Sequence, residues 1–127
     1  MKKIMIVDDS AAVRHILRTF LVGEGYEVVE ADSGGAGVAC AQAQAFDLII
    51  SDVNMPGMTG LEMIAAVRQL PSHVATPIFV MSTQASGEMT ARGKEAGATA
   101  WLTKPFRPEA LRNAIAQWVA RSPPTVP

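Results

Sequence analysis

Side chains that can bind a cation or a phosphoryl group follow four short apolar runs of this chain. They are Asp8 and Asp9 in "MIVDDS", Asp52 in "LIISDVNMPG", Ser82 in "FVMST" and Lys104 in "WLTKPF". Carboxylate oxygens with no His or Cys nearby favour a hard divalent cation, and few protein ligands beside open water positions suit Mg²⁺. The first candidate chemistry is therefore that of an oxygen-ligated magnesium site.

Charge balance indicates what such a site could bind. Two carboxylates about 4 Å apart repel by roughly 4 kcal/mol at an effective dielectric constant near 20, so Asp8, Asp9 and Asp52 need a compensating cation. Mg²⁺ and Lys104 together would neutralise the three carboxylates. If one carboxylate becomes esterified, a phosphoryl group can bind, because the metal, the ammonium group and the Ser82 hydroxyl all bind phosphoryl oxygens. Asp52 is the natural nucleophile.

Each of these residues also has an ordinary structural explanation. Asp8 and Asp9 could cap the helix that follows them, and Asp52 could form an Asx turn ahead of "MPG". A serine or a lysine taken alone, such as Ser82 or Lys104, carries little information. We favour a joint function because separate strand ends all supply matching chemistry.

The elements that must position these residues alternate between strands and helices. Short apolar or mixed runs predict strands at residues 4–7, 26–31, 48–50, 78–81 and 99–102. Apolar spacing and capping residues predict helices from Ser10 to Gly23, at 34–45, at 61–70, at 87–97 and from Pro108 onward. We expect Val13, Ile16 and Leu17 to lie in the core. The helix at 87–97 should be the loosest, because Gly93 in its middle costs about 1 kcal/mol relative to alanine.

This alternation predicts a doubly wound α/β fold with a parallel five-stranded sheet. In such sheets ligands bind beyond the carboxyl ends of the strands. A strand order of 2-1-3-4-5 makes the four candidate strand ends neighbours. The three carboxylates, the hydroxyl and the ammonium group would then meet in one shallow pocket.

Composition narrows the class of protein. With 127 residues, 49% hydrophobic content and a formal net charge of −1, the chain fits one domain and gives no sign of direct nucleic-acid binding. The apolar run after "MKK" is too short for a signal peptide or a membrane span, so we expect a cytoplasmic protein without membrane insertion. We assign residues 1–121 to the domain and residues 122–127, "SPPTVP", to a flexible proline-rich tail.

From residue 3 to about residue 121 the sequence resembles the receiver domain of two-component response regulators, in particular the single-domain chemotaxis-type regulators. The resemblance rests on "IVDDS", "DVNMPGMTG", "VMST" and "KPF", which stand in the family's order and at its spacing. It implies a flavodoxin-like (βα)₅ fold. It also implies Mg²⁺-dependent transfer of a phosphoryl group from a histidine kinase or phosphotransfer protein to an aspartate.

The resemblance also implies a role for each site residue. Asp52 would be the phosphoacceptor, and Asp9, Asp52 and the backbone carbonyl of Asn54 would hold Mg²⁺. Asp8 would act on the metal through a bound water. Lys104 would clamp the phosphoryl group, and its peptide bond to Pro105 would be cis.

The same resemblance implies a conformational response to phosphorylation and indicates which residues affect the rate of dephosphorylation. Phosphorylation would draw the Ser82 hydroxyl inward, and the side chain that responds is Trp101, where the family usually has Tyr or Phe. Trp101 could instead be ordinary packing between the last two helices. Asn54 and Gln84 would face the hydrolytic water, and since neither is a strong base we expect slow to moderate self-dephosphorylation.

The resemblance implies a signalling protein rather than a conventional enzyme: a phosphoacceptor that catalyses its own phosphorylation and slow dephosphorylation. The chain carries no output domain, so we expect a stand-alone regulator that passes its signal by binding. The switched surface would comprise residues 87–97, residues 99–102 and the last helix. The expected partners are the phosphoryl donor, which should dock near the first helix, a downstream target protein and a phosphatase.

Particular residues of the chain argue against four alternative functions. A degenerate receiver could serve as a constitutive docking module, although the complete acidic set and Lys104 argue against it. A phosphatase of the haloacid dehalogenase type needs a second aspartate two residues after its nucleophile, and Asn54 occupies that place. A flavin site is disfavoured because Asp8 and Asp9 would repel the cofactor phosphate, and a dinucleotide site because no G-x-G-x-x-G motif is present.

Overall fold

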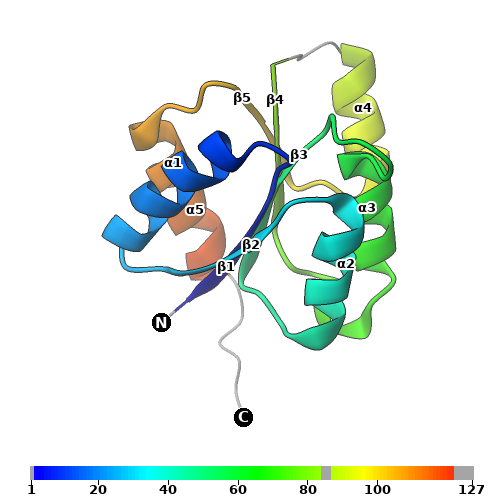
Figure 1. Ribbon diagram of the computed structural model, residues 1–127, viewed down its shortest axis with the longest axis horizontal. Coiled ribbons are helices and arrows are strands. Elements are labelled where there is room, and N and C mark those ends of the chain that lie inside the picture. The colour runs from blue at the N-terminus through cyan, green and yellow to red at the C-terminus, as the bar shows by residue number, and fades with distance from the viewer. Residues whose placement is uncertain (1, 84–86, 122–127) are drawn as a thin grey trace.

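The computed structural model describes residues 2–83 and 87–121 as five parallel strands alternating with five α-helices (Figure 1). In chain order the elements are β1 (Lys3–Val7), α1 (Ala11–Gly23), β2 (Glu27–Ala31), α2 (Gly34–Ala43), β3 (Leu48–Asp52), α3 (Gly60–Arg68), the 3₁₀ turn η1 (Pro71–His73), β4 (Ile78–Ser82), α4 (Gly87–Ala96), β5 (Ala100–Thr103) and α5 (Pro108–Arg121). The expected tail at 122–127 lies outside the described residues.

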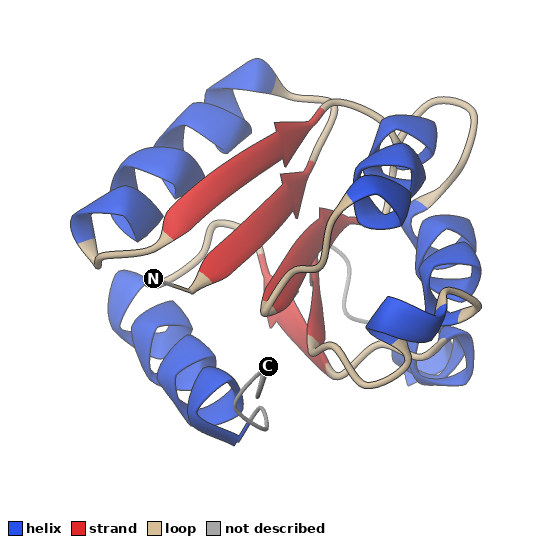
Figure 2. Ribbon diagram, turned by 90° about the horizontal axis from the view of Figure 1, so that it is seen from below, coloured by secondary structure: helices blue, strands red, loops and turns tan. Residues whose placement is uncertain are grey.

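The five strands form one sheet in the order β2-β1-β3-β4-β5, and every neighbouring pair is parallel. The strand arrows in Figure 2 accordingly lead to one common edge of the sheet. This arrangement confirms the predicted flavodoxin-like (βα)₅ fold. It places the carboxyl ends of β1, β3, β4 and β5 side by side, as a site at the strand ends requires.

Alternate residues of the central strands point to opposite faces of the sheet and contribute to two separate hydrophobic layers. One layer packs Ile6, Ile50 and Phe79 against α1 and α5, and the other packs Met5, Ile49 and Val80 against α2, α3 and α4. Figure 1 shows α1 and α5 on one side of the sheet and α2, α3 and α4 on the other. Because both faces are covered, β1, β3 and β4 contain unbroken apolar runs at residues 4–7, 48–50 and 78–81, which is the pattern that the sequence predicts.

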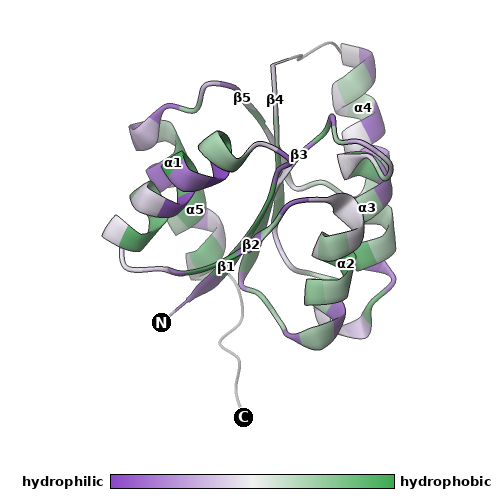
Figure 3. Ribbon diagram, in the orientation of Figure 1, coloured by the Kyte–Doolittle hydropathy of each residue, from purple (hydrophilic) through white to green (hydrophobic). Residues whose placement is uncertain are grey.

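The first helix follows its prediction at the ends but not along its whole inner face. Ser10 is the N-cap, and its hydroxyl accepts a hydrogen bond from the Val13 amide. Figure 3 shows alternating hydrophobic and hydrophilic stretches along α1, as an amphipathic helix should have. Leu17 is buried, whereas the Ile16 side chain is 56% exposed. The prediction of a core position was therefore wrong for Ile16, which lies on the outer edge of the apolar stripe.

A short turn that the sequence analysis did not predict precedes β4. Pro71, Ser72 and His73 form η1, and His73 is fully buried. The His73 Nε2 atom accepts a hydrogen bond from the Phe46 amide, and its Nδ1 atom is 2.9 Å from the Ser72 hydroxyl. This histidine therefore ties the chain before β4 to the chain before β3, at the sheet edge opposite the candidate site.

Candidate functional site

The side chains that follow β1 and β3 come together at the carboxyl edge of the sheet. Parallel pairing sets Val7 beside Ser51 and Asp52 beside Met81, so the ends of β1, β3 and β4 are in register. Asp8 continues from β1, where its amide donates to the Ala31 carbonyl at the end of β2. The backbone alone therefore directs two different aspartate-bearing strand ends to one point.

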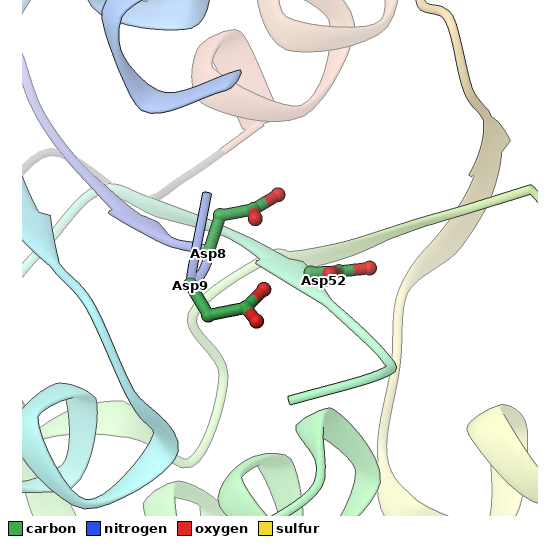
Figure 4. Close-up of side chains that lie close together, drawn as sticks. All are labelled: Asp8, Asp9 and Asp52. Atoms are coloured by element: carbon green, nitrogen blue, oxygen red, sulfur yellow. The ribbon is translucent and has the colours of Figure 1, made fainter. Parts of the chain in front are cut away.

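Three carboxylates converge there, as Figure 4 shows. Asp8, Asp9 and Asp52 each offer an oxygen atom, and these atoms lie within 4.8 Å of one another. Asp8 and Asp52 are buried, with 2% and 8% exposure, whereas Asp9 is exposed. The cluster is thus open to solvent on the Asp9 side and closed on the other.

Lys104 reaches this cluster from the end of β5. Its ammonium group lies 3.0 Å from Asp8 Oδ2 and 3.2 Å from Asp52 Oδ1. The Lys104 amide donates to the carbonyl of Ser82, and the Lys104–Pro105 peptide bond is cis. One cation therefore bridges the two buried carboxylates while its backbone is fixed to β4.

The electrostatics of the buried pair show that one lysine does not balance the cluster. Burial raises the pKa of Asp52 above its usual range, and the charge of Asp8 raises it further, against the smaller lowering effects of Lys104 and the Val53 amide. Burial also acts to lower the pKa of Lys104, but hydrogen bonds and charge from Asp8 and Asp52 outweigh it, so that pKa is raised. The pocket therefore keeps Lys104 protonated, and a further cation would stabilise its carboxylates.

The donor set therefore fits the expected divalent ion. Three carboxylates with one lysine leave a formal charge that a divalent cation would neutralise, and the ligand atoms are all oxygens. Asp9, Asp52 and the backbone at Asn54 stay the expected ligands. The exposed Asn54 side chain lies two residues beyond the end of β3.

The two aspartates after β1 do not serve as the side-chain cap of α1. Ser10 fills that position, and Asp8 Oδ1 instead accepts from the Ser10 amide. The guanidinium of Arg14 donates to the Asp8 carbonyl at 2.6 Å and also pairs with Glu30 on β2. Arg14 is a supporting residue that sequence reasoning missed, because the i, i+6 contact has no periodic signature.

Gly60 is a second residue that sequence reasoning missed. Its amide donates to the Val53 carbonyl, and a Cβ atom at this position would lie 2.0 Å from the Asp52 carbonyl oxygen. Any side chain here would collide with the backbone that carries Asp52. Gly60 is the last residue of the motif "DVNMPGMTG", to which the sequence analysis gave no separate role, and it directly follows Thr59, which caps α3 by a capping box with Glu62.

The remaining predicted residues are placed as follows. Ser82 is buried at the end of β4, adjacent in register to Thr103. Trp101 is half-buried on β5 and packs on the sheet face covered by α2, α3 and α4, so it lies against α4 rather than between α4 and α5. Gln84 lies outside the described residues.

The chain is similar in sequence to a known protein family and to several known proteins. The family model described as the response regulator receiver domain matches residues 4–116. The transcriptional regulatory protein ResD of Bacillus subtilis is 37% identical over 106 residues, which are 84% of this chain and 43% of ResD, so the chain spans less than half of that relative. Protein PilH of Pseudomonas aeruginosa is 36% identical over 118 residues, which are 91% of this chain and 95% of PilH.

Among solved structures, the chemotaxis protein CheY4 of Vibrio cholerae superimposes with a TM-score of 0.89 at 45% sequence identity. The match covers 92% of this chain and 98% of that chain. Within residues 2–83 and 87–121, none of the helices is long and apolar enough to span a membrane.

Proposed function

Because the chain belongs to the response regulator receiver domain family, whose members are phosphoacceptors that interact with histidine kinases and downstream targets, we propose that it takes up a phosphoryl group on Asp52. The observation that carries the proposal is the junction of Asp8, Asp9, Asp52 and Lys104 in one pocket. A docking module without chemistry has no need to bury two carboxylates around one lysine.

The Asp52 carboxylate attacks the phosphorus atom of a donor phosphohistidine, and the phosphorus–nitrogen bond breaks as the acyl phosphate forms. Asp9, Asp52 and the Asn54 carbonyl would hold Mg²⁺, with Asp8 acting through water, and the bound ion would supply charge stabilisation for the transferred group. Lys104 binds a phosphoryl oxygen, for which it exchanges one of its two carboxylate contacts. The Ser82 hydroxyl, at the neighbouring strand end, supplies a further hydrogen bond.

The phosphoryl donor is proposed to dock beside α1. An apolar groove of about 410 Å³ runs from Val13 and Ile16 on α1 to Pro105 and Phe106, and Lys104 lines it as well. The exposed Ile16 in the groove that Lys104 also lines gives a partner helix a place to bury apolar surface while its histidine faces Asp52. The exposed position of Ile16 supports this proposal.

The signal is proposed to leave through α4, β5 and α5, by binding of a separate downstream protein. Self-dephosphorylation should be slow to moderate because Asn54 and Gln84 can orient water without acting as strong bases. Equal decay rates in Asn54→Ala, Gln84→Ala and the unmodified protein would remove both residues from this role. A phosphatase partner and the cytoplasmic location stay predictions.

Acetyl phosphate with Mg²⁺ tests the chemistry directly. Intact-mass measurement should show the mass of one added phosphoryl group, and this addition should disappear with EDTA and in the Asp52→Asn variant. No mass change in the unmodified protein would favour the degenerate receiver instead. Labelling that persists in Asp52→Asn would assign the acceptor elsewhere.

A second experiment separates docking from chemistry. Ile16→Glu should slow transfer from a phosphorylated histidine phosphotransfer domain but leave the reaction with acetyl phosphate unchanged, because it charges the groove without touching the pocket. His15→Glu, which charges a neighbouring exposed position of α1, is the matched control. Equal loss with both donors would contradict the assigned docking surface.

A further inference from the structure

The fourth helix contains a glycine whose presence its backbone does not explain. Gly93 lies inside α4, and its φ angle is not among the positive values of Gly25, Gly57 and Gly97. Any residue could adopt this conformation, and alanine would favour the helix by about fivefold in the folding equilibrium constant. Gly93 is nonetheless buried. Its smallness must therefore serve a contact.

That contact is with the indole of Trp101. A Cβ atom at Gly93 would lie 2.7 Å from Trp101 Cζ3 and 2.9 Å from Cε3, whereas the next neighbour, Ala98 Cβ, would be at an ordinary 3.8 Å. The six-membered ring of the indole therefore lies directly on the helix backbone. No alanine side chain fits between them unless the indole or the helix moves.

Trp101 lies on β5 close to the strand ends that form the candidate site. It pairs in register with Val80 on β4, two residues before the Ser82 and Thr103 pair at the strand ends. Its indole also forms part of the wall of a surface pocket of about 340 Å³, together with Thr90 and Lys94 of α4. A displaced indole would change this surface while leaving the carboxylate pocket intact.

We propose that Gly93 is a positioning residue that seats the Trp101 indole on α4 and thereby sets the resting shape of the surface formed by α4 and β5. A side chain at residue 93 drives the indole off the helix. The role assigned to Trp101 as the responding side chain rests on the proposed function, but the seating itself does not depend on phosphorylation.

A double-mutant cycle tests the contact. In the Trp101→Val background, Gly93→Ala should raise the folding equilibrium constant by about fivefold, which is the helix-propensity gain. With Trp101 present, the same substitution should lower it. Gly87→Ala adds a methyl group to α4 in open space and should have the same effect in both backgrounds. Equal effects of Gly93→Ala in both backgrounds would overturn the proposal.

Tryptophan fluorescence of the folded protein reports on the position of the indole and does not change with a general loss of stability. In a Trp118→Phe background, emission reports on Trp101, the other of the two tryptophans. Gly93→Ala should shift this emission to longer wavelength and increase its quenching by acrylamide in the folded protein, and Gly87→Ala should do neither. An unchanged spectrum and unchanged quenching would refute the seating of the indole.

Phosphorylation is measured separately. The Gly93→Ala protein should take up a phosphoryl group from acetyl phosphate and Mg²⁺ as fast as the unmodified protein, since the pocket residues are untouched. A smaller fluorescence change on phosphorylation in Gly93→Ala supports the positioning role, and an identical change overturns it. If neither protein is phosphorylated, the proposed function fails while the cycle and the quenching still decide the seating.

Discussion

Replacing Asp52 by asparagine tests the electrostatic account of the site most directly. The substitution keeps the shape of the side chain and the oxygen that accepts from the Val53 amide, but removes one of three clustered charges. Lys104 keeps its contact with Asp8 at 3.0 Å, so no buried cation is left unpaired. The experiment therefore changes charge at this site with little change in packing.

The distances give the sign and size of the effect without metal. Carboxylate oxygens within 4.8 Å imply two repulsions on Asp52 of about 3.5 kcal/mol each at an effective dielectric constant near 20, against an attraction to Lys104 at 3.2 Å of about 5 kcal/mol. The repulsion from exposed Asp9 must be reduced for screening, but burial adds a further penalty to the Asp52 charge. We expect Asp52→Asn to stabilise the metal-free protein by about 1 to 2 kcal/mol.

Urea denaturation in EDTA and in Mg²⁺ measures both halves of this prediction. At a hundredfold excess over its dissociation constant, Mg²⁺ should add about 2.7 kcal/mol to the unmodified protein. It should add much less to Asp52→Asn. Glu95→Gln, which removes an exposed charge on α4, is the control for net charge and should show neither effect. The reasoning is refuted if Asp52→Asn is the less stable protein in EDTA, or if it keeps the full gain from Mg²⁺.

Two further predictions concern residues outside the acidic cluster. Gly60→Ala should abolish phosphorylation by acetyl phosphate, measured by intact mass, because its Cβ would meet the Asp52 carbonyl; Gly37→Ala, crowded instead by Val7 and Met63, should lower stability by about 1 to 3 kcal/mol yet keep the reaction. Activity in the first or its loss in the second would be the opposite of what we expect. Burial, with the charge of Arg68, lowers the pKa of His73 from its usual 6.5, so the free energy of unfolding should fall as pH drops below about 6.5. Denaturation between about pH 6.5 and 5.5 should show a shallower slope for His73→Gln, and an unchanged slope would exclude His73 as its source.

The order of the elements and the residues at the strand ends could be predicted because both depend on local sequence. Apolar runs mark buried parallel strands, and the first polar residue after each run marks the strand end. Once the fold is known, the parallel register brings Asp8 and Asp52 together. The family resemblance added the roles of these residues, which the geometry alone does not assign.

Contacts between distant segments could not be predicted in the same way. Arg14 holds the Asp8 carbonyl and His73 accepts from the Phe46 amide, and both contacts depend on how loops lie over the sheet. Ile16 fits the apolar period of α1, yet it is 56% exposed, so the elements within residues 2–83 and 87–121 leave that edge of the helix uncovered. A periodic pattern states which side of a helix is apolar, but it does not state how much of that side has a partner.

The charge of the site also indicates why the response should travel along β4 and β5. In the proposed phosphorylated state, the phosphoryl group on Asp52 would add negative charge to a pocket in which three carboxylates face one lysine, and Lys104 and Ser82 are the described side chains proposed to bind it. These two are joined by the bond from the Lys104 amide to the Ser82 carbonyl. A displacement of Lys104 or Ser82 would therefore shift the ends of both β4 and β5. Trp101 lies on the same β5 strand, and its indole lies against α4 in the space that Gly93 leaves. Gly93 in the middle of α4 costs that helix about 1 kcal/mol relative to alanine, whereas α5 contains no glycine, so we expect α4 to move before α5.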